Sequence, residues 1–331
     1  MTSTPPHDPG SDAATPEQDA AAPACVMSFN ASDPSGAGGL SADIATIAAM
    51  GAHALPVITS ILMRDTAEIF DQHLIEGDAI VEQARYVLED VTLAGFKVGF
   101  LGSAENVSAV AEILSDYAEV PLVSYLPSLG WLEEDDAQSY LDAFRELILP
   151  ATEVLVGNHK TLTDFLLPDW DSDRPASPRE LAVAAAEHGT RFVLVTGVML
   201  PPKGSTGQFI DNVLASAQGA LTGEKFELFD VGFVGAGDTL SAALAALLAV
   251  QAELQAAVGE ALQFLDQSLD AGFRPGMGNI VPDRFFWALP PEDEAAAGTD
   301  GTPSSSPDVD EDDGPAASEP PTAPGGSRRV H

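Results

Sequence analysis

Apolar residues recur along this chain in two alternating patterns, short continuous runs and longer stretches with helical spacing. The short runs are typical of strands that are buried on both faces of a sheet, and they lie at 25–29, 54–62, 96–101, 120–125, 153–157 and 191–197. Stretches with apolar residues three and four positions apart follow most of these runs and predict helices, at 40–48, 75–89, 104–117, 133–149, 162 onward and 178–188. Segments 207–214 and 225–230 predict an antiparallel pair, and two helices follow residue 237. Phe285-Phe286-Trp287 is expected to pack against the fold as a final apolar clamp.

This order of elements predicts an α/β fold, with a mostly parallel central sheet and helices on both faces. Ligands bind such sheets at the carboxyl ends of the strands. The segments that follow the predicted strands are therefore expected to form the site, and they lie at 30–39, 64–65, 99–102, 125–130, 158 and 235–238.

One of these segments, Gly235-Ala236-Gly237-Asp238, lies between a predicted strand and an Ala/Leu-rich helix. Glycines allow a sharp turn there, and the unpaired N–H groups and dipole of a helix N-terminus form an anion site. The carboxylate of Asp238 beside that site suits a general base in phosphoryl transfer to a hydroxyl. The alternative is a glycine loop in which Asp238 only caps the helix.

Composition narrows the possible ligands. The chain has 331 residues with 14 Lys+Arg against 51 Asp+Glu, a net charge of −37, which argues against binding to nucleic acid or to an anionic membrane. No G-x-x-x-x-G-K-[ST] motif is present, so a bound nucleotide would rely on backbone N–H groups and Mg²⁺. Cys25 is the single cysteine, and no apolar run reaches transmembrane length or resembles a signal peptide. A cytoplasmic location is the resulting expectation.

Both ends of the chain differ from its middle. Residues 1–23 are rich in Pro, Ala, Asp and Thr without periodicity, and residues 292–331 are similar with an acidic run at 308–313. We predict a disordered N-terminal arm over 1–23, one folded domain over 24–291 and a disordered acidic tail over 292–331.

Several motifs together resemble the ribokinase-like kinases, and more narrowly the hydroxymethylpyrimidine/phosphomethylpyrimidine kinases of thiamine biosynthesis. The blocks that carry the resemblance are Ser32-Asp33-Pro34-Ser35-Gly36-Ala37-Gly38 with Ala42-Asp43, Met50-Gly51-Ala52-His53-Ala54-Leu55-Pro56-Val57-Ile58-Thr59, Asp65-Thr66, Phe96-Lys97-Val98-Gly99 and Gly235-Ala236-Gly237-Asp238-Thr239. The resemblance covers roughly residues 25–290, and its first block is the most specific.

The resemblance implies ATP and Mg²⁺ as cofactors and a small-molecule acceptor. It implies an anion hole at Gly235, Ala236 and Gly237 with Asp238 as base. It also implies acceptor contacts at Asp43, Ala31 and Arg64, and nucleotide contacts at Thr196, Asn158 and Thr239. In this branch the position of Asp238 is often Cys, so an aspartate there resembles the sugar kinases of the superfamily.

Some positions depart from the family pattern. Arg64 stands where the family has a glutamine that contacts the pyrimidine, Ser41 replaces another glutamine, and Ala31 replaces a glycine. The family's Asn-x-x-Glu, associated with Mg²⁺, ends here at Thr161, and a strand-end aspartate is missing near Tyr125. No metal ligand is therefore assigned, because hard oxygen ligands hold that ion.

Several single residues keep two interpretations. Asp43 is either an acceptor ligand or a solvent-facing helix residue, and Asn158 either places a metal-bound water or caps the next helix. Lys97 is either a phosphate contact or a snorkelling side chain. Arg64 either binds an anionic acceptor or forms a surface ion pair, while Asp33 is expected to shape its loop.

These observations predict an ATP-dependent kinase for hydroxymethylpyrimidine, its monophosphate or both, with a small-molecule substrate and, in addition, a homodimer. One alternative is a ligand-binding or regulatory paralogue with weakened catalysis. Another is a kinase for a different acceptor, such as a pyridoxine-like alcohol.

Overall fold

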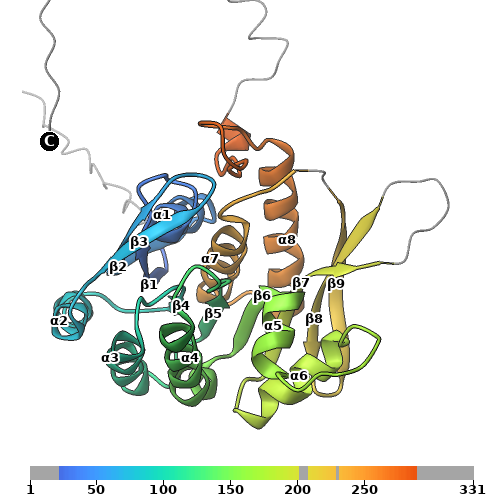
Figure 1. Cartoon of the computed structure of the whole chain (residues 1–331). Helices are drawn as coiled ribbons and strands as arrows, with labels where there is room; N and C mark the ends of the chain where they lie inside the picture. The colour runs from blue at the N-terminus through green and yellow to red at the C-terminus, as the bar shows by residue number, and fades with distance from the viewer. Residues whose placement is uncertain (1–21, 201–207, 229–230, 289–331) are drawn as a thin grey trace, which may run out of the picture. The chain divides into compact units, whose positions relative to one another are not determined.

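The computed structural model describes residues 22–200, 208–228 and 231–288 (Figure 1). The predicted arm 1–23, except for residues 22 and 23, and the predicted tail 292–331 lie outside these residues, as does the end of the strand predicted at 225–230. The described residues up to Trp287 belong to one compact unit, and Ala288 is the described residue of a second unit, 288–331.

The described residues form a nine-stranded sheet in the order β3-β2-β1-β4-β5-β6-β7-β8-β9. Its strands are β1 (Cys25–Ser32), β2 (His53–Arg64), β3 (Ile69–Leu74), β4 (Gly95–Val98), β5 (Leu122–Leu126), β6 (Val154–Asn158), β7 (Phe192–Met199), β8 (Phe209–Ser216) and β9 (Gly219–Glu227). All pairings from β2 to β7 are parallel, and β3, β8 and β9 pair antiparallel at the two edges. The predicted fold class is confirmed, with β4 and β5 at the middle of the parallel part.

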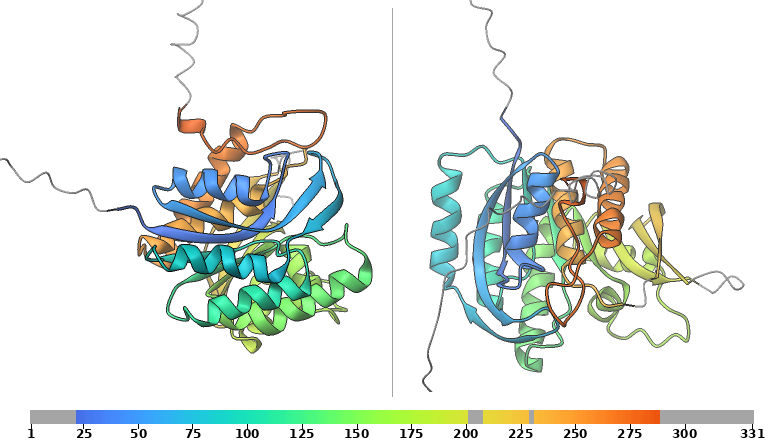
Figure 2. Two further views of the ribbon diagram at one scale, coloured as in Figure 1. Left: turned by 90° about the vertical axis from the view of Figure 1, so that its left-hand side faces the viewer. Right: turned by 90° about the horizontal axis from the view of Figure 1, so that it is seen from above.

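Helices cover both faces of the sheet. They are α1 (Gly39–Ala49), α2 (Gly77–Leu88), α3 (Ala104–Ser115), α4 (Glu134–Ala143), α5 (His159–Leu166), α6 (Pro178–Glu187), α7 (Ala236–Ala249) and α8 (Leu254–Asp270). One core joins α1, α7 and α8 to the first face, and a second core joins α2 to α6 to the other. In the left view of Figure 2 the blue α1 and the teal α2 and α3 lie on opposite sides of the strands.

Helix α7 lies against the centre of the sheet. Ten of its fourteen residues are buried, because α1 and α8 flank it while β1, β4 and β5 lie beneath it. Alanine at many of these positions keeps the helix close to its neighbours and has the highest intrinsic helix propensity. This packing brings the N-terminus of α7 to the carboxyl ends of β1, β4 and β5, where ligands bind such sheets.

Three local predictions were incomplete. Strand β3 was not predicted, because its mostly exposed residues alternate weakly, yet it pairs with β2 and extends that strand to Arg64. The single helix predicted over 133–149 is α4 followed by a π-helical turn, Phe144–Ile148, and a 3₁₀ turn, Leu149–Ala151. The apolar clamp predicted at 285–287 holds only for Phe286, which packs on Phe264, since Phe285 and Trp287 are exposed.

Candidate active site

Helix α7 begins at the predicted glycine loop. Gly235 is its N-cap residue in the left-handed conformation (φ 86°), and a Cβ atom there would overlap the carbonyl group of Ala37. Only glycine combines this conformation with so close a contact, so loops 235–238 and 36–39 pack directly on each other. The first N–H groups of a helix lack intrahelical partners and carry its positive dipole end, which is the arrangement that anion sites use.

A cavity of about 200 Å³, here called the α7 cavity, opens beside this helix start. Ala236 and Gly237 line it from α7, and Asn158 and Thr196 line it from the ends of β6 and β7. Its other walls are mainly apolar, and they include Ile210, Phe226, Leu240 and Leu265. An apolar wall next to a helix N-terminus can hold a planar base while backbone N–H groups face its phosphates.

A smaller cavity of about 80 Å³, the Asp238 cavity, lies on the other side of the same loop. It is lined by Asn30, Ala31, Gly39, Leu62, Arg64, Ile69, Phe100, Tyr125, Pro127, Ser128, Trp131 and Asp238. Phe100 and Trp131 meet edge to face with ring centroids 5.4 Å apart. Tyr125 packs so closely against Gly237 that a Cβ atom there would overlap its ring. The two cavities therefore meet at residues 237 and 238, one lined by N–H groups and the other by a carboxylate.

A buried charge network lies behind Asp238. The ammonium of Lys97 donates to Asp238 Oδ1 (2.8 Å) and to both oxygens of Asp43 (2.9 and 3.0 Å). Asn30 Nδ2 lies 2.8 Å from Asp238 Oδ1 and 2.9 Å from Asp43 Oδ2, and Ser28 donates to Asp43 at 2.6 Å. The side chains of Lys97 and Asp43 are 0% exposed, whereas that of Asp238 is 15% exposed. Asp238 is thus the acid of the network that faces a cavity.

Burial and ion pairing set the pKa values of these groups in opposite directions. Burial disfavours the ionised form of Asp238, but the charge of Lys97 and the hydrogen bonds from Lys97, Gly39 and Asn30 outweigh it, so the pKa of Asp238 lies below its ordinary value. For Asp43, burial outweighs the attraction to Lys97, and its pKa is raised. The pKa of Lys97 is raised because the two carboxylates outweigh its desolvation. Asp238 is therefore held ionised, as a general base must be.

The loop after β1 is shaped by Asp33, as predicted. Its carboxylate accepts hydrogen bonds from the Ser35 N–H (2.8 Å), the Ser35 hydroxyl (2.6 Å) and the Gly38 N–H (2.8 Å). Arg64 lies 3.4 Å from the same carboxylate and donates to the carbonyl oxygen of Asp65. The Arg64 side chain is only 9% exposed, so its ion pair is not a surface pair, and its guanidinium lines the Asp238 cavity.

A second buried cation joins the two loops. Arg284 Nη2 donates to the Ala37 carbonyl at 2.5 Å and lies 3.5 Å from the Gly235 carbonyl, and Nε donates to Thr239 Oγ1 at 2.9 Å. Arg284 comes from the segment after α8 and is nearly fully buried. It therefore ties the C-terminal part of the compact unit to both loops of the site.

The predicted site residues fall into three groups. Ala31, Arg64 and Asp238 line the Asp238 cavity, and Asn158, Thr196, Ala236 and Gly237 line the α7 cavity. Gly235, Asp43 and Thr239 line neither cavity, and the last two are fully buried, so the solvent-facing interpretation of Asp43 is wrong. The capping interpretation of Asn158 is confirmed, because its side chain accepts a hydrogen bond from the Lys160 N–H.

The sequence did not predict the positions of four polar residues of the site. Lys97 neither snorkels to solvent nor lines a cavity, and Ser28, Asn30 and Arg284 were not singled out. A usable signal exists for three of them. Ser28 and Asn30 occupy alternate positions of an otherwise apolar strand, and Lys97 lies inside another. Polar groups on such strands must be buried and therefore need partners.

The donor set does not fit a metal ion held by protein side chains. No group of three or more His, Cys, Asp or Glu side chains converges among the described residues. Mg²⁺ requires hard oxygen ligands. Glu227 is the acidic residue that lines the α7 cavity, where this ion would accompany a nucleotide.

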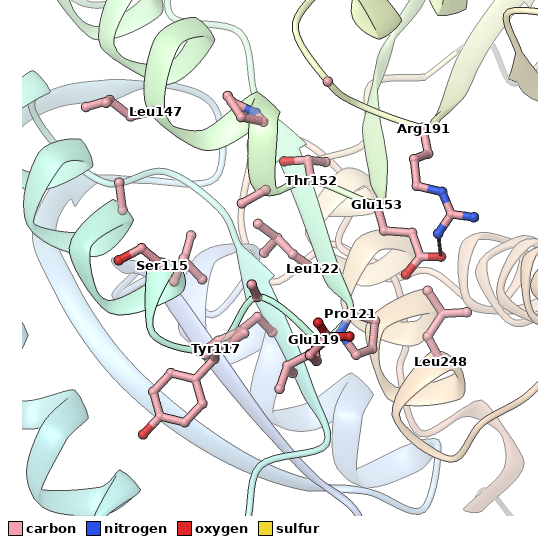
Figure 3. A pocket seen from close by; sticks show the side chains of 18 of the residues that line it. Ser115, Tyr117, Glu119, Pro121, Leu122, Leu147, Thr152, Glu153, Arg191 and Leu248 are labelled. Atoms are coloured by element: carbon pink, nitrogen blue, oxygen red, sulfur yellow. Dashed lines mark hydrogen bonds and ion pairs between the residues drawn. The ribbon is translucent and has the colours of Figure 1, made fainter.

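A larger cavity of about 850 Å³ lies at the opposite ends of the strands (Figure 3). Pro121, Thr152, Glu153 and Arg191 line it where β5, β6 and β7 begin. Its charged pair, Arg191 with Glu153, is solvent-accessible. Volume therefore does not identify the site, whereas the convergence of charges at Asp238 does.

Across the part of the chain that the structure describes, no helix is long and apolar enough to cross a membrane.

Comparison with known proteins agrees with this geometry. Residues 33–283 match the model of the phosphomethylpyrimidine kinase family. The hydroxymethylpyrimidine/phosphomethylpyrimidine kinase of Mycobacterium tuberculosis is 30% identical over 78% of this chain and 92% of its own length. That of Streptomyces coelicolor is 28% identical over 81% of this chain and 96% of its length. The chloroplastic thiamine biosynthetic bifunctional enzyme of Arabidopsis thaliana is 30% identical over 74% of this chain, which spans 46% of that longer protein.

Solved structures share the fold. Bacillus subtilis pyridoxal kinase, determined as an ADP complex, superimposes with a TM-score of 0.70 at 20% identity, over 81% of this chain and 100% of that one. Phosphomethylpyrimidine kinase from Clostridium difficile gives a TM-score of 0.57 at 20% identity, over 73% and 98% of the two chains. With the family match over most of the compact unit, the chain belongs to the phosphomethylpyrimidine kinase family and is an ATP-dependent kinase.

Proposed function

We propose that this kinase transfers the γ-phosphoryl group of ATP to hydroxymethylpyrimidine, to its monophosphate, or to both, in thiamine biosynthesis. One observation carries the proposal. Asp238 faces one cavity while Ala236 and Gly237, in the same helical turn, face the other. A phosphoryl donor and an acceptor placed in the two cavities would meet at the helix N-terminus.

The monophosphate would attack the γ-phosphorus through an oxygen of its phosphate and needs no base. With hydroxymethylpyrimidine, the Asp238 carboxylate takes the proton of the acceptor hydroxyl. The hydroxyl oxygen then bonds to the γ-phosphorus, the bond from that phosphorus to the β–γ bridging oxygen breaks, and ADP leaves. The N–H groups at the start of α7 stabilise charge on the transferred group, since phosphoryl transfer depends mainly on positioning and electrostatics. Asn158 and Thr196 are the proposed nucleotide contacts, and no step is assigned to a protein-held metal.

The acceptor is tested by measuring ADP formation by the purified full-length chain with ATP and Mg²⁺. Hydroxymethylpyrimidine, its monophosphate and pyridoxine are supplied separately, and a reaction without acceptor is the control. We expect turnover with at least one pyrimidine, and preference for pyridoxine would assign a different acceptor. Binding of a pyrimidine without any turnover would support the regulatory paralogue instead.

The cytoplasmic location and the homodimer belong to this proposal as well.

Arg64 is proposed to select between the two pyrimidines. Its guanidinium lines the Asp238 cavity and is the cation there that can meet a phosphorylated acceptor. In Arg64→Gln, kcat/KM for the monophosphate relative to the unphosphorylated pyrimidine is expected to fall about tenfold, since a charge-assisted contact becomes a neutral one. Arg85→Gln, which removes an exposed ion-paired arginine on α2, is the matched control. An unchanged ratio in Arg64→Gln would assign that guanidinium to Asp33 alone.

A further inference from the structure

Building on the proposed function, we infer that Lys97 and Asp43 form a charge-balancing pair that keeps Asp238 ionised and directed at the acceptor. Lys97 is then a positioning residue, because it acts through Asp238 and does not line either cavity. Asp43 acts in the same way, through Lys97, instead of contacting the acceptor.

The geometry leaves Lys97 no free donor. An ammonium group has three N–H donors, and the three short contacts of Lys97 go to Asp43 Oδ1, Asp43 Oδ2 and Asp238 Oδ1 at 2.8 to 3.0 Å. Asn30 Nδ2 contacts the same two carboxylates, so both acids are held against one cation and one amide. The ammonium therefore cannot bind a phosphate without breaking this set.

A lysine on β4 needs these hydrogen-bond acceptors in order to remain buried. Phe96 and Val98 flank Lys97 in a strand that is buried at every position, and a buried unpaired ammonium is strongly disfavoured. The chain contains 14 Lys+Arg in 331 residues, and it places one of these cations at 0% exposure between two acids. Stability alone does not explain this choice, because buried ion pairs often contribute little compared with apolar residues.

Charge balance gives the pair a function. Asp43 and Asp238 with Lys97 carry one net negative charge. Other ionisable groups around them are Tyr125 from β5, Arg284 from the segment after α8, and Asp33 and Arg64 on the cavity side. Burial and the charge of Asp238 raise the pKa of Tyr125, so it stays neutral. Lys97 is therefore the cation in direct contact with both acids among the described residues.

Three variants separate charge balance from simple packing. Lys97→Met leaves two carboxylates sharing Asn30, and like charges so close in a buried site cannot both ionise, so Asp43 and Asp238 would share one proton near neutral pH and Asp238 would be a weaker base. In Asp43→Asn, Asp238 is the remaining carboxylate beside Lys97, which would lower the pKa of Asp238 further. The double variant Lys97→Met with Asp43→Asn leaves Asp238 as the one acid beside two amides, which restores the net charge of the wild-type set.

The experiment measures kcat against pH for the full chain and the three variants with the acceptor that the wild type phosphorylates. For Lys97→Met, kcat at pH 7 is expected to fall about 100-fold and to recover toward pH 9, with the KM for ATP nearly unchanged. For Asp43→Asn, the fall of kcat on the acid side of the pH profile should move to lower pH. The double variant should turn over at least about tenfold faster than Lys97→Met at pH 7. If the variants act only by disturbing the packing, the double variant should be the slowest of the three, and that result would overturn the inference.

A substrate-free measurement separates failure of this inference from failure of the proposed function. Lys97→Met should bind a proton on folding, because the folded state raises a carboxyl pKa above its unfolded value. Its free energy of unfolding in urea should then fall from pH 5 to pH 8 more steeply than that of the wild type. The double variant should lose this extra slope. Equal slopes in all proteins would refute the charge-balancing pair, whereas wild-type inactivity on every acceptor would refute only the function.

Discussion

Replacing Asp238 with asparagine is expected to lower kcat by about 10² to 10⁴-fold, which is the usual contribution of a positioned general base. Asparagine has nearly the same shape, and its oxygen can still accept from Asn30 and Lys97, although its NH2 group cannot accept from the Gly39 N–H. It cannot accept the hydroxyl proton, however. The KM for ATP should change little, because Asp238 does not line the α7 cavity. ADP release at saturating acceptor measures the effect.

The matched control is Asp142→Asn, which removes an exposed carboxylate of an ion pair on α4 and should leave kcat within about twofold. Circular dichroism of Asp238→Asn verifies that it is folded. If the Asp238→Asn protein retained a third or more of wild-type kcat, the base would have to be another group or water, and Asp238 would remain only a helix-terminal residue.

The second large effect is expected for Gly237→Ala. Alanine is the better helix former, yet its methyl group would overlap the ring of Tyr125, which is partly buried and lines the Asp238 cavity. Overpacking of this kind destabilises by about 1–3 kcal/mol. Displacement of the helix start by about 1 Å is also expected to lower kcat about 100-fold. Urea denaturation and steady-state kinetics measure the two consequences separately.

Gly259→Ala is the counterpart on α8. Nothing lies within 4 Å of a Cβ atom at that position, so the same substitution should stabilise the protein by up to about 1 kcal/mol and leave kcat unchanged. Opposite signs for the two helical glycines would identify the contact with Tyr125 as the cause. Equal effects would mean that Tyr125 moves aside freely.

Much of the fold was predictable because burial leaves a periodic signal in the sequence. Strands such as β6 and β7 are buried on both faces and read as continuous apolar runs, which also predicted their parallel pairing. The start of α7 was predictable because glycine tolerates its backbone conformation. Strand β3 was not predictable, since its residues are largely exposed and its pairing depends on β2.

The candidate site was predictable only where a loop follows a strand. Asp238, Ala31 and Arg64 line one cavity, as expected where parallel strands bring their carboxyl ends to one edge of the sheet. The partners of Lys97 and Arg284 could not be predicted, because Asp238 lies 141 residues from Lys97 in the chain and Ala37 lies 247 residues from Arg284. Periodicity identifies which positions are buried, but it does not reveal which buried groups meet.

The contacts of Asp238 and Arg284 have a consequence for the order of folding. Asn30 contacts Asp238 across 208 residues, and Ala37 contacts Arg284 across 247. Contacts so distant in the chain form slowly, because a long loop must close first. The local βα units can therefore form before the site is complete. On dilution from urea, recovery of turnover should lag behind recovery of the far-ultraviolet circular dichroism signal, and the enzyme becomes active only when its last helices and its first strand have met.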